Sequence, residues 1–88
     1  MACRLADRVR VRKESWGLLF YLPARHRVCF VKSRDWLYPR HFDGTWTPGD
    51  IAADVARRTA LPVEKVERCL YPLTDRLKKD RVITDEVR

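Results

Sequence analysis

Apolar and basic residues alternate near the start of the chain. Across residues 8–13, Val9 and Val11 are each flanked by arginine, a period-two pattern typical of a half-buried strand. Residues 16–22 then form a nearly continuous apolar run that ends at Pro23. A run of this length and composition predicts a strand that is covered on both faces.

A third extended segment, residues 27–32, follows after a short turn. Its alternation places Val28 and Phe30 on one face and Cys29 and Val31 on the other. We therefore expect the second and third segments to form a hairpin, with the first segment beside it.

The next residues favour helices. Ser33 is a suitable N-cap for a short helix over residues 33–42, although Pro39 would bend or shorten it. Gly44 would end this helix by adopting a positive φ angle, and Thr47 would cap a second helix. We expect the segment between them to be the hinge of a small helical unit.

Two longer helices are predicted in the second half of the chain. One covers residues 48–58, with Pro48 at its first position and Asp50 near its positive end. The other covers residues 63–79, and its apolar stripe continues through Pro72, which should kink it. The apolar positions are Ile51, Ala52, Val55 and Ala56 in the first helix and Val63, Val66, Leu70, Leu73 and Leu77 in the second.

The order of these elements defines the expected fold. A three-stranded antiparallel sheet would be followed by three helices gathered on one of its faces, which is an α+β fold. A short apolar tail, Val82 and Ile83, would return to the core or to the sheet. At 88 residues, we expect a single domain over residues 1–88, with a core too small for a large catalytic cleft.

Positive charge is concentrated in the first half of the chain. The formal net charge is +7; residues 1–46 contain ten basic and four acidic residues, whereas residues 47–88 contain nine and eight. Such a field attracts an acidic partner, which would be a nucleic acid, an anionic membrane or an acidic peptide. A solvated basic surface that maintains solubility is the alternative interpretation.

The sequence also indicates the compartment. No apolar run reaches the roughly 18 residues of a transmembrane helix, and residues 1–13 are too charged for a secretory signal. Cys3, Cys29 and Cys69 are far apart, so they indicate neither a disulfide framework nor a zinc site, and buried or inert thiols are favoured. We therefore expect a cytoplasmic protein that does not bind membranes.

Few residues suggest catalysis. His26 and Cys29 are three apart on a strand and would point to opposite faces, which excludes a nucleophile–base pair. His41 fits a satisfied surface or capping histidine near a helix end. Asp50 and Asp54 lie close to arginines and are expected on a solvated helix face. We predict a protein that is not an enzyme and that binds no cofactor and no metal.

Two groups of residues resemble a known family. One is the motif Asp43-Gly44-x-x-Thr47-x-x-x-Ile51 together with the ending Arg81-Val82-Ile83. The other is the hairpin Trp16-Gly17-Leu18-Leu19-Phe20-Tyr21-Leu22 and Arg27-Val28-Cys29-Phe30-Val31-Lys32-Ser33-Arg34. The first resembles the RiPP recognition elements, the family founded by the peptide chaperone of pyrroloquinoline quinone biosynthesis. The hairpin is most similar to chaperones of the mycofactocin system.

This resemblance implies a winged-helix-like fold and a peptide-binding function. The leader of a ribosomally made precursor peptide would add as an antiparallel strand to the third strand, and the complex would be delivered to a radical SAM maturase. The maturase would carry iron–sulfur clusters, which this chain itself would not bind. The implied site consists of Arg27, Val28, Cys29, Phe30, Val31 and Lys32 on the strand, and of Leu70, Leu73, Arg76 and Leu77 on the last helix. For the apolar members the alternative is a core position, and for the basic members a solvated charge.

A nucleic-acid interpretation ranks second. Residues 51–70, broken at residues 60–62, resemble a helix-turn-helix, and the pI near 9.8 suits a small winged-helix DNA-binding protein. Glu64 and Glu67 would nevertheless face phosphates, which opposes the electrostatic attraction on which DNA binding depends. Nucleic acid is therefore not the expected partner. An open apolar edge strand also makes a homodimer plausible.

Overall fold

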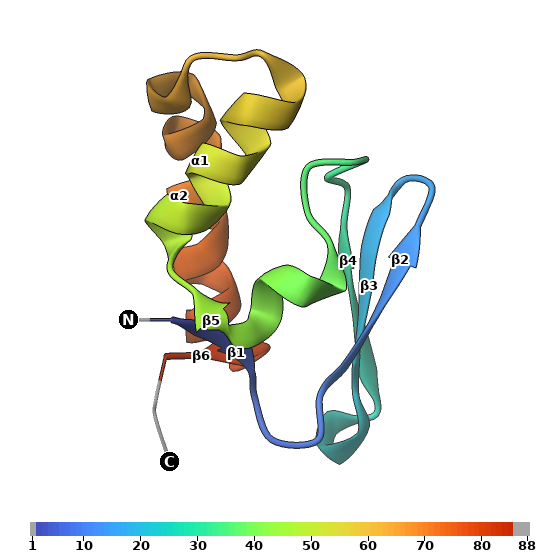
Figure 1. Cartoon of the computed structure of the whole chain (residues 1–88). Coiled ribbons are helices and arrows are strands. Elements are labelled where there is room, and N and C mark those ends of the chain that lie inside the picture. Colours follow the sequence, from blue (N-terminus) through green and yellow to red (C-terminus); the bar gives the residue numbers. More distant parts are fainter. Residues whose placement is uncertain (1, 86–88) are drawn as a thin grey trace.

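A computed structural model describes residues 2–85 of the chain (Figure 1). The strands are β1 (Cys3–Leu5), β2 (Arg10–Glu14), β3 (Gly17–Leu22), β4 (Arg27–Val31), β5 (Asp43–Trp46) and β6 (Ile83–Thr84). The α-helices are α1 (Pro48–Thr59) and α2 (Val63–Lys79), and the 3-10 helices are η1 (Pro23–Arg25) and η2 (Pro39–Phe42). Figure 1 shows α1 and α2 side by side above β1, β5 and β6, with the other three strands standing apart from them.

The first sheet is an antiparallel meander in the order β2-β3-β4. Its register pairs Val11 with Phe20 and Phe20 with Cys29. Gly17 opens β3 with a φ angle of +149°, and a Cβ atom there would lie 1.9 Å from the carbonyl oxygen of Val31. Only glycine allows this approach of the two strands. The three strands predicted from the sequence are confirmed, with ends that differ by two residues or fewer.

The second sheet has the order β5-β1-β6. Cys3 pairs with Trp46, and Leu5 pairs with Ile83, which is buried. The prediction that the apolar tail returns to the core or to a sheet is therefore confirmed. Neither β1 nor β5 was predicted. Gly44 has the expected positive φ angle, 95°, but it lies within β5 and not in a hinge between helices.

The helix predicted over residues 33–42 is wrong. Arg34 has a φ angle of +48°, which interrupts a helix at its second residue. Tyr38 is extended, with φ −133° and ψ 156°, because a residue that precedes proline avoids the helical region. Pro39 consequently begins a new turn, and only η2 forms.

The two longer helices are confirmed. Thr47 caps α1 by accepting a hydrogen bond from the Asp50 amide, and the Asp50 carboxylate accepts one from the Thr47 amide, both at 3.0 Å. Helix α2 runs through Pro72 without interruption. The stripes are largely buried as predicted, and the buried members are Ile51, Ala52, Val55, Val66, Leu70 and Leu77.

The expected fold class, one three-stranded sheet followed by three helices in a winged-helix-like arrangement, is wrong. Residues 2–85 instead form two α-helices and two separate three-stranded antiparallel sheets. A single apolar core joins them, because buried residues of both sheets and both helices belong to one cluster. Its largest side chains include Phe20 from the meander and Phe42 from η2, whose rings meet edge to face at 5.6 Å between centroids.

Candidate functional site

Strand β4 is an open edge of the meander. In residues 2–85 it pairs with β3 only. Its side chains Val28 and Phe30 are 45% and 62% exposed, although both are apolar. Exposed apolar residues on an unpaired edge are unusual, because such an edge is a template for pairing with another chain.

The exposed side chains of β4 belong to a larger surface. Tyr21, opposite Val28, is 44% exposed, and Leu19 lies opposite Phe30. The Trp16 ring packs against the Phe30 ring in a tilted arrangement, with ring centroids 5.6 Å apart. These five residues form what we call the outer patch, on the face of the meander that points away from the core.

The backbone of β4 also presents hydrogen-bonding groups. Because Gly17 lies against the carbonyl oxygen of Val31, that carbonyl points toward β3. Along an antiparallel strand, successive residues direct their backbone groups to alternate sides. The N–H and C=O groups of Val28 and Phe30 therefore point away from β3, where an added strand would meet them.

The opposite edge of the meander differs in chemistry. Strand β2 carries Arg10, Arg12, Lys13 and Glu14 among its five residues. Charged side chains on an edge discourage pairing with other strands. Strand β4 has an arginine only at its first position. The two edges are thus distinguished, and β4 is the one suited to accept a strand.

The inner side of β4 approaches α2. Cys29 is partly buried, and burial raises the pKa of its thiol. The charge of Arg76 on α2 opposes this shift, which means that Arg76 lies near enough to Cys29 to act on it. The Arg25 guanidinium donates a hydrogen bond of 3.1 Å to the carbonyl oxygen of Asp80, which connects the start of β4 to the end of α2. Leu73 is partly buried against the core.

The residues predicted for the site therefore differ in how exposed they are. Val28, Phe30, Arg27, Lys32 and Arg76 are exposed, and Cys29 and Leu73 are partly buried. The others, Val31, Leu70 and Leu77, are buried in the core and are not available to a ligand in this conformation.

Cations surround both ends of β4. Arg25 and Arg27 lie at its beginning, and Lys32 and Arg34 lie just after its end. All four are exposed, and within residues 2–85 none has an ion pair with an acidic side chain. We call these four residues the cationic rim. An unpaired group of like charges produces a field that attracts anions.

A second cluster surrounds Asp54, in the middle of α1. Sequence analysis placed this carboxylate on a solvated face, but it is only 4% exposed. It accepts hydrogen bonds from Arg57 at 2.8 Å and Arg58 at 3.0 Å, and its Oδ2 lies 2.9 Å from Nε2 of buried His41. Burial raises the pKa of Asp54, but the hydrogen bonds from His41 and Arg58 and the Arg58 charge outweigh burial and lower it to about 2.

This cluster holds the segment that follows β4. Arg58 donates hydrogen bonds of 2.6 Å to the carbonyl oxygens of Asp35 and Trp36. The side chain of His41 accepts a hydrogen bond of 3.0 Å from the Tyr38 amide through Nδ1, so Nε2 carries the proton that it donates to Asp54. The cluster thus anchors the chain between β4 and η2 to α1, and it fixes the exit of the edge strand.

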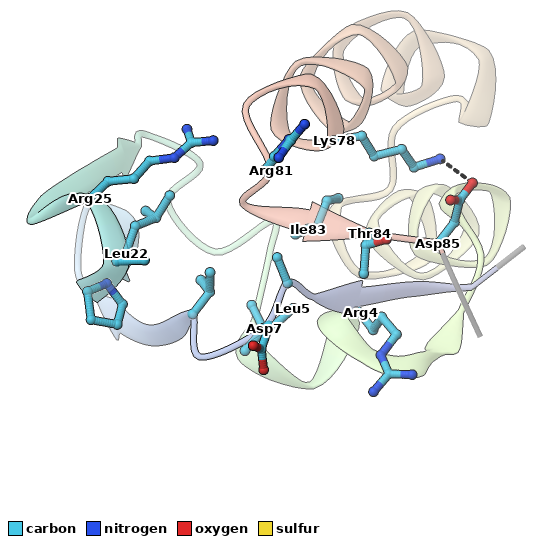
Figure 2. Close-up of a pocket in the computed structure, with 14 residues that line it drawn as sticks. Arg4, Leu5, Asp7, Leu22, Arg25, Lys78, Arg81, Ile83, Thr84 and Asp85 are labelled. Carbon is cyan, nitrogen blue, oxygen red and sulfur yellow. Dashed lines mark ion pairs between the residues drawn. The ribbon is translucent and has the colours of Figure 1, made fainter. Parts of the chain in front are cut away.

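A cavity of about 790 Å³ lies between the second sheet and the end of the meander at which η1 joins β3 to β4 (Figure 2). Lys78 and Asp85 form an ion pair of 3.6 Å across one part of its wall. Figure 2 shows Arg25 and Arg81 extending to one side and Arg4 to the other, so their guanidinium groups do not converge on one point. This lining does not define a binding site for a particular charge.

Comparison of the chain with protein-family models, with curated proteins and with solved structures gives no match. Among residues 2–85, neither helix is both long and apolar enough to cross a membrane. Across the same residues, no three His, Cys, Asp or Glu side chains gather as a metal ion would require. The resemblance to RiPP recognition elements therefore stays a prediction, and the geometry of β4 is the basis for assigning a function.

Proposed function

We propose that the chain is a non-catalytic peptide-binding protein that takes up an extended segment as an additional strand on β4. In line with the family resemblance, the segment would be the leader of a ribosomally made precursor peptide, which the chain delivers to a radical SAM maturase. The observation that carries the proposal is the edge itself. Strand β4 is unpaired on one side within residues 2–85, and its Val28 and Phe30 are exposed.

Strand addition explains both features of this edge. Main-chain hydrogen bonds from the peptide to Val28 and Phe30 would give affinity that does not depend on sequence. Side chains alternate across the new strand, so half would extend the outer patch and half would face Cys29 and α2. Burial of apolar area on the outer patch stabilises such a complex at roughly 25 cal/mol per Å² before the cost of ordering the peptide.

The experiment separates backbone pairing from side-chain contact. Peptides would first be selected by the full chain from a random 12-residue phage-displayed library, and one selected sequence would be synthesised. Val28→Pro removes an outward-pointing N–H group at an edge position that tolerates proline, whereas Val28→Ala removes only the side chain. We expect calorimetry to show a large loss of affinity with Val28→Pro and a small loss with Val28→Ala.

Amide hydrogen exchange provides an independent measurement. Peptide binding should slow exchange at Val28 and Phe30, while the amides of β2 should remain unchanged. Circular dichroism melts would first establish that both variants fold. A folded Val28→Pro variant with unaltered affinity, and free exchange at these two amides in the complex, would exclude strand addition on β4.

A further inference from the structure

The surroundings of β4 restrict the sequence of the peptide that it would bind. The cationic rim places two positive charges at each end of the strand, and the segment from Arg25 to Arg34 contains no aspartate or glutamate. Exposed cations without an acidic side-chain partner attract carboxylates of a ligand, and Arg25, which within residues 2–85 donates only to the neutral carbonyl oxygen of Asp80, keeps its uncompensated charge. A ligand strand that extends beyond both ends of β4 would therefore gain most from acidic residues at its two ends.

The outer patch sets a second restriction. In an antiparallel pair, side chains directly opposite each other on one face lie close enough to pack. A strand added to β4 would place two of its side chains, separated by one residue, opposite Val28 and Phe30. Aromatic and β-branched residues pair favourably with such partners, and they would cover surface that is now exposed to water.

We infer that the ligand of β4 is an acidic peptide in which two apolar side chains at positions i and i+2 pack on the outer patch and carboxylates at both ends pair with the cationic rim. This inference rests on the proposed function and specifies its ligand. The i, i+2 pair faces away from the core, so it contacts the outer patch and not the space between β4 and α2.

Two other occupants are less compatible with this surface. A second copy of the chain would bring one cationic rim against another, because an antiparallel pair of β4 strands places like charges together. Single-stranded nucleic acid binds through aromatic rings on which bases stack. In the outer patch, however, the Trp16 and Phe30 rings are tilted by 49° against each other, and Tyr21 lies opposite the aliphatic Val28, so the aromatic rings do not form one stacking surface for bases.

The test compares selections from the same random 12-residue library by the wild-type chain and two double variants. The wild-type chain should enrich peptides with acidic ends and an apolar i, i+2 pair. Arg27→Gln with Lys32→Gln should lose the acidic preference and keep the apolar pair. Val28→Thr with Phe30→Thr should lose the apolar pair and keep the acidic preference, since threonine retains strand propensity.

A matched control removes two positive charges elsewhere. Arg10→Gln with Arg12→Gln changes the net charge equally, but at the opposite edge. A synthetic selected peptide should bind the rim variant about five- to twentyfold more weakly than wild type, since each exposed ion pair contributes roughly a two- to fivefold factor. The control should change affinity by less than about twofold, and salt should abolish the difference.

The outcomes separate the inference from the function on which it rests. Enriched peptides that lack acidic ends or the apolar pair would overturn the inference and leave strand addition in place. Failure to enrich any peptide would overturn both. A 12-nucleotide single-stranded RNA that binds the wild-type chain more tightly than the selected peptide does, and that loses this affinity in the Val28→Thr with Phe30→Thr variant, would overturn both in favour of a nucleic-acid surface.

Discussion

At the scale of single residues, the least expected feature is the burial of Asp54. Its spacing to Arg57 and Arg58 indicates ion pairs within one helix, and these form. The burial of Asp54, however, involves a contact with another element. His41 of η2 lies against the carboxylate, and the Tyr38 amide donates a hydrogen bond to the other nitrogen of the His41 ring. A contact between elements that pack only in the folded chain has no signature in local spacing, so the sequence indicated the charges and not their environment.

The same cluster predicts how stability depends on pH. Burial lowers the pKa of His41 below 6.5, and the charges of Arg40 and Arg58 lower it further, although the hydrogen bond to Asp54 opposes them. The folded state therefore disfavours the protonated imidazole, which would lose the acceptor at Nδ1 that Tyr38 uses. The stability that comes from keeping His41 neutral should be fully present above the pKa of His41 in the unfolded chain. It should decrease as the pH falls through and below about 6.5.

Chemical denaturation at several pH values tests this dependence. Asp54, with a pKa of about 2, stays ionised between about pH 7 and pH 5, so it does not contribute there. His41→Gln should flatten the profile in this window and lower the free energy of unfolding by about 1–3 kcal/mol, because Asp54 loses a buried partner. His26→Gln, which replaces an exposed histidine outside the cluster, serves as the control. An identical slope in the His41 variant would contradict the assignment.

At the scale of elements, the strands and helices that local periodicity defines were predicted correctly. The strands that depend on long-range pairing were not. The strands of the meander and both long helices follow from patterns within single segments. Strands β1 and β5 are three and four residues long, and they are stabilised by partners about 40 residues apart. The helix predicted over 33–42 failed because one positive φ angle and one proline interrupt it.

Helix α2 offers a test of which side chains serve the fold and which serve the ligand. Leu77 is 2% exposed, so Leu77→Ala should destabilise the fold by about 2–5 kcal/mol. Leu73 is only partly buried, and Leu73→Ala should cost the fold less while weakening peptide binding. Thermal melts and titration with a library-selected peptide on both variants compare the two effects. A large drop in Tm with unaltered affinity for Leu73→Ala would assign Leu73 to the core alone.

At the scale of the whole molecule, the two halves of the candidate site, the strand and the helix, were not equally predictable from the sequence. The site was predictable from the sequence as far as the strand: alternation identified Val28 and Phe30 as neighbours on one face. It was less predictable on the helix, where Leu70 and Leu77 carry the same apolar pattern as Leu73 but are buried. A stripe that is wider than the ligand surface cannot by itself reveal which of its residues remain accessible.

Self-association should depend on salt in an uncommon direction. Pairing of two β4 edges would oppose two cationic rims, and this repulsion acts over about 10 Å at 0.1 M ionic strength but only about 3 Å at 1 M. We expect sedimentation velocity to show monomers at the lower ionic strength and a growing dimer fraction at the higher one. Val28→Pro should abolish the dimer, whereas Val28→Ala should retain part of it, because the backbone groups of β4 form the contact. A dimer that is strongest at low salt, or that persists in Val28→Pro, would place the interface elsewhere on the molecule.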